Sequence, residues 1–78
     1  MNEAIVGKWK WVAGTNTYEF YSDGTYDYVG GHRTNGRYRI EGNILKFVDM
    51  GTESEISLSG DNLSMRVQGN WIFFKRVY

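Results

Sequence analysis

The stretch YEFYSDGTYDY, residues 18–28, places five aromatic residues around a single Ser-Asp-Gly turn. On both sides of the turn large and polar residues alternate, which is the pattern of two half-buried strands joined as a hairpin. Because successive strand residues point to opposite faces, Tyr18 and Phe20 share one face, and Tyr26 and Tyr28 share one face after the turn. We interpret these rings mainly as the wall of a small core, with an aromatic platform for a ligand as the alternative.

The same alternation continues along the chain between turns rich in Gly, Asn and Asp. It predicts eight short strands, at 6–12, 16–22, 25–30, 34–41, 44–49, 53–59, 62–68 and 70–77, with only residues 2–6 weakly compatible with a helical turn. Turns this short favour antiparallel neighbours. Gly24, Gly42 and Gly60 recur at one hairpin-sized interval, as in an up-and-down meander. We therefore predict an all-β fold, a small antiparallel meander that closes into a barrel.

The inward face of such a barrel can be followed from strand to strand. Beyond the opening stretch, the residues predicted to share it are Trp9, Trp11, Tyr38, Ile40, Leu45, Phe47, Ile56, Leu58, Leu63 and Met65. Strands of five to eight residues span about 17–26 Å, so a barrel holding this many rings should keep little cavity. A buried tyrosine needs a hydrogen-bond partner, which a barrel mouth can provide as water or ligand. The candidate ligand-binding residues are therefore Tyr18, Tyr26, Tyr28, Tyr38 and Trp11.

The length and the net charge of the chain limit the classes of protein to which it can belong. The 78 residues suit one domain, 1–78, and the absence of cysteine removes disulfides and thiolate metal sites. Nine basic and nine acidic residues cancel, which argues against a nucleic-acid or membrane partner. No secretory signal or long apolar segment is present, so we expect a cytoplasmic protein, or a secreted one whose signal is missing from the sequence.

Few residues suit catalysis. The single histidine, His32, lies in a glycine-rich loop, and Glu53 and Glu55 fit the polar face of a strand. A general base needs an orienting partner, and a metal needs several converging ligands. We expect no enzyme activity, no cofactor and no metal, and keep a small hydrolase using His32 with these acids as an alternative.

The final segment, NWIFFKRVY at 70–78, is apolar on both faces. Trp71 and Phe73 share one face, and Ile72 and Phe74 share the other. One face should fill the core. The other is either covered by residues 1–6 or a loop, or forms an interface with a partner protein or a second copy of the chain. Single-stranded nucleic-acid binding is a further alternative, and its candidate residues are Tyr21, Tyr28, Arg33, Arg37 and Arg39.

The first strand carries Gly7-Lys8-Trp9, and a basic residue, Arg76, stands near the end of the last strand. With the hairpin-sized repeat, these features resemble the lipocalin-like, or calycin, barrels. The runs IVGKWKWV, TYEFYSDGTYDY and GRYRIEGNILKF look like small bacterial lipocalin-like domains. The resemblance implies that Trp9 lies at the closed end of the barrel with Arg76 packed across it, Lys75 being the poorer substitute. We expect a non-catalytic binding module for a partner protein or a small apolar or aromatic molecule at the barrel mouth.

Overall fold

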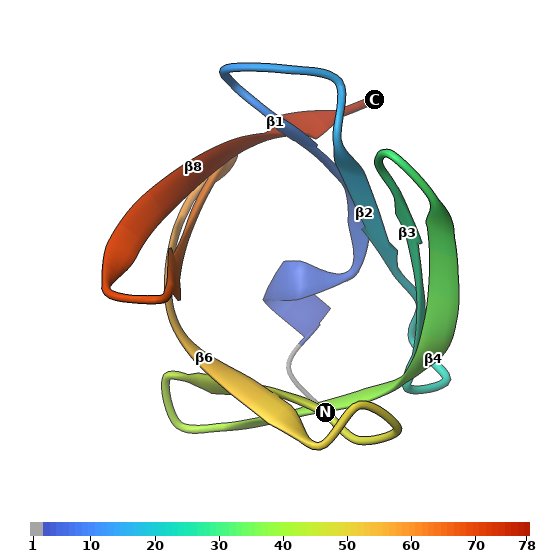
Figure 1. Cartoon of the computed structure of the whole chain (residues 1–78). Coiled ribbons are helices and arrows are strands. Elements are labelled where there is room, and N and C mark those ends of the chain that lie inside the picture. The colour runs from blue at the N-terminus through green and yellow to red at the C-terminus, as the bar shows by residue number, and fades with distance from the viewer. Residues whose placement is uncertain (1–2) are drawn as a thin grey trace.

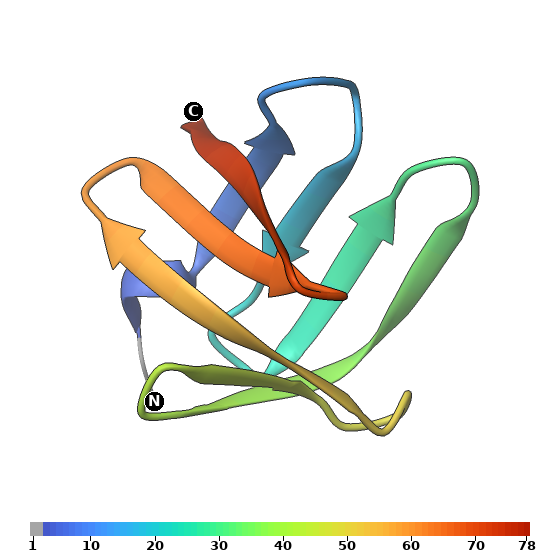
Figure 2. The same cartoon turned by 60° about the vertical axis from the view of Figure 1, so that its left-hand side comes forward.

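In a computed structural model, which describes residues 3–78, eight antiparallel strands follow one another and close into a barrel (Figures 1 and 2). The elements are the 3-10 turn η1 (Glu3–Ile5) and the strands β1 (Gly7–Trp11), β2 (Thr17–Phe20), β3 (Thr25–Val29), β4 (Arg33–Glu41), β5 (Ile44–Phe47), β6 (Thr52–Ser59), β7 (Asn62–Val67) and β8 (Asn70–Val77). The predicted all-β meander barrel is confirmed, and its architecture is consistent with a lipocalin-like barrel.

Several predicted strands are one or two residues too long at their ends. The strands expected at 16–22 and 44–49 end at Phe20 and Phe47. The residues that follow belong to tight turns, where Gly24 donates to the Tyr21 carbonyl at 3.2 Å and Gly51 donates to the Phe47 carbonyl at 3.0 Å. Local turn hydrogen bonds therefore end the ladder earlier than side-chain alternation suggests.

Two strands change partners along their length. The first part of β4 pairs with β3, and from Tyr38 onwards β4 pairs with β5. In the same way β6 pairs first with β5 and, from Ile56 onwards, with β7. These two changes of partner bend the sheet around β5, so a chain with short strands can still close on itself.

The predicted inward face is the core of the barrel. Its buried members include Trp9, Phe20, Tyr26, Tyr38, Leu45, Phe47, Ile56, Leu63 and Met65, while Trp11, Tyr18, Tyr28, Ile40 and Leu58 are partly buried against them. The choice between the two faces of β8 is settled as well, since Phe74 is 4% exposed and Phe73 is 53% exposed. Ile5 of η1 adds a fully buried side chain that alternation could not find, because a single 3-10 turn has no strand period.

One end of the barrel is closed by η1, which lies across the lumen in Figure 1. The Trp9 indole N–H donates to the Ile5 carbonyl at 2.8 Å. The Arg76 guanidinium lies 4.3 Å from the centre of the Trp9 ring and donates to the Val6 and Ala4 carbonyls at 2.8 and 2.7 Å. The contact implied by the family resemblance is thus present, and it ties both ends of the chain to one indole.

The backbone at Gly7 makes room for this arrangement. Its φ of +134° is rarely adopted by residues that have a side chain, and a Cβ there would lie 2.5 Å from Arg76 Nη1. Glycine therefore lets the chain pass directly beneath the guanidinium.

Gly7→Ala should lower the free energy of unfolding by about 1–3 kcal/mol, because the methyl group adds backbone strain and displaces Arg76. Gly31→Ala is the matched control, since a Cβ there meets nothing within 4 Å. Its effect should stay within about 0.5 kcal/mol. Urea denaturation of both variants makes the comparison, and equal losses would contradict the close packing at Gly7.

Phe20→Ala should cost about 3–5 kcal/mol of unfolding free energy, because Phe20 is 1% exposed and its removal leaves a cavity. Phe73→Ala deletes the same side chain from the outer surface of β8 and should cost no more than about 0.5 kcal/mol. Thermal melting followed by circular dichroism compares the two. A Phe20→Ala variant with the same melting temperature as the wild type would show that the inward face is wrongly assigned.

Candidate functional site

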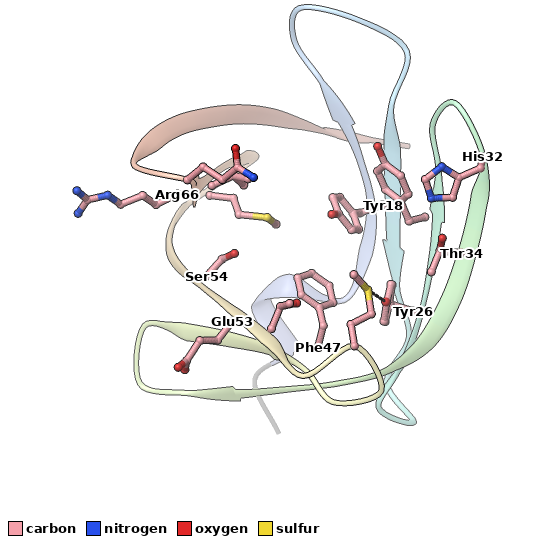
Figure 3. A pocket seen from close by; sticks show the side chains of 14 residues that line it. Tyr18, Tyr26, His32, Thr34, Phe47, Glu53, Ser54 and Arg66 are labelled. Atoms are coloured by element: carbon pink, nitrogen blue, oxygen red, sulfur yellow. Dashed lines mark hydrogen bonds between the residues drawn. The ribbon is translucent and has the colours of Figure 1, made fainter.

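The end of the barrel opposite η1 is hollow. A pocket of about 490 Å³ lies there between the β3–β4, β5–β6 and β7–β8 connections (Figure 3). Its walls are aromatic, formed by Tyr18, Tyr26, Tyr28 and Phe47, and the apolar side chains of Met50, Met65 and Val67 add to the lining. The short strands therefore leave space at the mouth even though the closed end is filled.

Tyr18 stands at the centre of the aromatic wall. Its ring centroid lies 4.7 Å from that of Tyr28, 5.8 Å from that of Phe47 and 5.6 Å from that of Phe74. Tyr26 meets Phe47 edge to face at 4.9 Å. Rings packed at these distances hold one another in place, so the wall is formed before any ligand arrives.

The tyrosine hydroxyls differ in how they are satisfied. The Tyr26 hydroxyl donates to the Met50 sulfur at 3.2 Å. Within residues 3–78, no hydrogen-bond partner is found for the Tyr18 and Tyr28 hydroxyls, although both residues line the pocket. Burial raises the pKa of Tyr18 to about 12, with smaller contributions from Tyr28 and Tyr26. The Tyr18 hydroxyl thus stays neutral and can donate or accept a hydrogen bond in the pocket.

The charged residues of the rim face away from this wall. In Figure 3 the side chains of Arg66 and Glu53 point away from the hollow, and Arg66 lies 3.7 Å from the Glu55 carboxylate. His32 is at the rim, with its ring 6.2 Å from that of Tyr28. Ser54 and Thr34 add uncharged polar groups to the lining. The site is therefore suited to an uncharged ligand with an aromatic or apolar body.

The structure brings together four of the five residues suggested for ligand binding. Tyr18, Tyr26 and Tyr28 line the main pocket, and Trp11 lines an adjoining hollow of about 190 Å³. Tyr38 does not reach the mouth. It lies past the point where β4 changes partners, is 5% exposed, and its hydroxyl donates to the Tyr21 carbonyl at 2.9 Å.

Several lining residues were missed in the sequence interpretation, and Ser54 and Met50 illustrate two different reasons. Ser54 lies two residues before the inward Ile56, so strand alternation could have placed it on the inner face. Met50 belongs to the β5–β6 turn, and nothing in its local pattern marks it as a lining residue. Its position is set by how β5 and β6 fold over the mouth.

The residues considered for catalysis are not brought together. His32 and Glu53 lie on opposite sides of the pocket in Figure 3, and Glu55 is occupied by Arg66 outside the pocket. In the part of the chain that the structure describes, no three His, Asp or Glu side chains form a group able to hold a metal. The same residues include no helix long and apolar enough to cross a bilayer.

The interface residues divide between the two faces of β8. Trp71 and Phe73 point outward, 40% and 53% exposed, whereas Ile72 and Phe74 face the interior. β8 pairs with β7 over residues 70–75, whereas its ladder with β1 covers only residues 74–77, so the first half of β8 has a strand partner on one side only. Self-association through the outer face of β8 stays a prediction.

The residues suggested for nucleic-acid binding are largely engaged elsewhere. Tyr28 faces the mouth, and the Tyr21 hydroxyl donates to Asp27 at 2.8 Å. Their three neighbouring arginines all pair with carboxylates: Arg33 with Asp27 at 4.0 Å, Arg37 with Asp49 at 2.7 Å and Arg39 with Glu41 at 2.9 Å. This surface is balanced in charge.

No protein-family model, curated protein or solved structure matches the chain.

The raised pKa of Tyr18 predicts a delayed alkaline titration. Since the folded-state pKa of about 12 exceeds the ordinary 10.0, stability from the neutral hydroxyl is complete below pH 10 and is lost as pH rises through 12. At about pH 11 the phenolate absorbance of Tyr18→Phe should equal that of the wild type, because Tyr18 still keeps its proton. A Tyr18→Phe variant with less phenolate at that pH would show that Tyr18 titrates normally.

Proposed function

We propose that this protein is a non-catalytic binding module that takes a small, uncharged, aromatic or apolar molecule into the open mouth of its barrel. The observation that carries the proposal is the pocket of about 490 Å³ walled by Tyr18, Tyr26, Tyr28 and Phe47. Pockets for small molecules commonly measure about 300–1,000 Å³ and combine an apolar wall with a few polar groups.

The side chains of the pocket wall indicate which class of ligand the pocket can bind. Flat aromatic groups can pack against rings that are already held by their neighbours, so little ordering is needed on binding. The Tyr18 and Tyr28 hydroxyls have no partner within the described chain, so a carbonyl, hydroxyl or amine on the ligand would gain a hydrogen bond there. A charged ligand would lose hydration without an opposite charge to replace it.

The resemblance to lipocalin-like barrels supports the same function. In this protein η1, Trp9 and Arg76 seal one end, so a ligand would enter and leave only through the mouth. Membership of that family is part of the proposal, and it rests on the barrel, on Gly7-Lys8-Trp9 and on the basic residue of the last strand.

Binding can be tested with the neutral fluorescent probe N-phenyl-1-naphthylamine, whose emission rises in apolar sites. We expect saturable binding of one probe per chain. Ser54→Trp should weaken it by about tenfold or more, because an indole at Ser54 would fill the pocket. Ser57→Trp places the same indole on the exposed face of the same strand and should leave the affinity unchanged.

Both variants must keep the wild-type circular dichroism for the comparison to hold. Equal affinities of Ser54→Trp and Ser57→Trp would place the probe outside the mouth and contradict the proposal. Absence of saturable binding to the wild type would contradict it as well.

A further inference from the structure

The zero net charge of the chain conceals an uneven distribution over the barrel. Three neighbouring strands, β7, β8 and β1, contain no Asp or Glu. Their outer surface, which we call the β7–β8–β1 face, carries Lys8, Lys10, Arg66, Lys75, Trp71 and Phe73. The acidic residues of the described chain lie on the other elements and in the turns.

The lysines of this face differ from the other basic residues. Arg33, Arg37, Arg39, Lys46, Arg66 and Arg76 each have a carboxylate oxygen within 4.0 Å. Within residues 3–78, Lys8, Lys10 and Lys75 form no such ion pair, even though Glu19 lies opposite Lys8 in the strand register. Three lysines without an ion pair are therefore collected on one side of a neutral protein, although Glu19 and Asp27 border the same surface hollow as Lys8 and Lys10.

Strand pairing places these charges beside exposed aromatic rings. Trp71, Phe73 and Lys75 follow one another along the outer row of β8, and Lys75 lies directly opposite Lys10 of β1. Arg66 lies opposite Trp71 on the other side. Alternate residues of a strand are about 6.6 Å apart, so rings and charges succeed one another in regular steps along one line.

We propose that the β7–β8–β1 face binds single-stranded nucleic acid, with bases stacked on Trp71 and Phe73 and phosphates placed against Lys75, Lys10 and Lys8. Exposed aromatic rings beside a row of cations are the combination by which small β proteins hold single strands without reading their sequence. Lysine is a compact charge suited to phosphate. The proposed site is on the outer wall, so it is a second activity beside the mouth pocket.

Two other occupants fit the face less well. A symmetric contact with a second copy would bring the unpaired lysines of both copies together, and such like charges oppose association. An acidic protein would satisfy the lysines, but lysine is depleted in protein interfaces. Two exposed rings in line with the charges favour stacked bases.

The experiment measures fluorescence anisotropy of labelled oligothymidylate and oligouridylate, each of about 15 nucleotides, with the full chain. The affinity should fall with salt along a log–log slope of about −2, because three phosphates release their counterions at about −0.7 each. Equal affinity for both strands points to phosphate and stacking alone, and tighter binding of oligouridylate points to RNA. Either result supports the proposal, whereas absence of binding to both strands would overturn it.

Two triple variants test whether binding depends on the position of these three lysines or only on the net charge of the protein. Lys8→Gln with Lys10→Gln and Lys75→Gln should abolish binding. The matched control, Arg33→Gln with Arg39→Gln and Lys46→Gln, lowers the net charge by the same amount on other faces and should bind like the wild type. Equal loss in both triple variants would show a general charge effect and overturn the proposal.

The aromatic rings have their own test. Trp71→Ala and Phe73→Ala should each weaken binding by about tenfold. Polyglutamate should compete poorly, because it offers charges without bases. Unchanged affinity of both ring variants, or polyglutamate competing as well as the oligonucleotide, would overturn the proposal in favour of a simple anion or acidic-protein surface. Ser54→Trp should keep nucleic-acid binding, so failure of the pocket proposal and failure of this one remain distinguishable.

Discussion

The barrel depends on the contact between Arg76 and Trp9. The guanidinium covers the indole at 4.3 Å and at the same time holds the carbonyls of Ala4 and Val6. One side chain of the last strand thereby fixes both the first strand and the turn in front of it. A cation over an aromatic face contributes only about 0.5–2 kcal/mol, but here it acts together with two charge-assisted hydrogen bonds and with the register between β1 and β8.

Because η1 closes one end of the barrel, the space for a ligand lies at the opposite end. Because η1 and Ile5 fill the space beneath Trp9, the inward rings of the closed half pack against one another. Towards the mouth the rings of Tyr18, Tyr26 and Tyr28 border a hollow instead, with Met50 of the β5–β6 turn at its edge. The same inward row of side chains is thus core at one end and site wall at the other. Position along the barrel, rather than residue type or burial, separates the two roles, since Tyr26 of the pocket wall is only 2% exposed.

Strand order also separates the charges. The strands that meet at the closure, β8 and β1, come from opposite ends of the chain, and each brings lysines without acids. In the sequence Lys8 and Lys10 are far from Lys75, and the total charge is zero. Only the antiparallel pairing of Lys10 with Lys75 makes them neighbours. A neutral chain can therefore present a locally basic surface, which composition alone argues against.

The fold class, the inward face and most of the strands could be predicted from the pattern of residues along the chain. Alternation around Ser22-Asp23-Gly24 is a local property, because side-chain direction on a strand follows from backbone geometry. It also found the rings of Tyr18, Tyr26 and Tyr28. Which of those rings line the pocket, why Tyr38 lies away from the mouth, and where Met50, Ile5 and Lys75 lie follow only from the folded arrangement of the strands. These positions depend on closure, on the partner changes of β4 and β6, and on pairing between distant segments, none of which leaves a periodic signal in the chain.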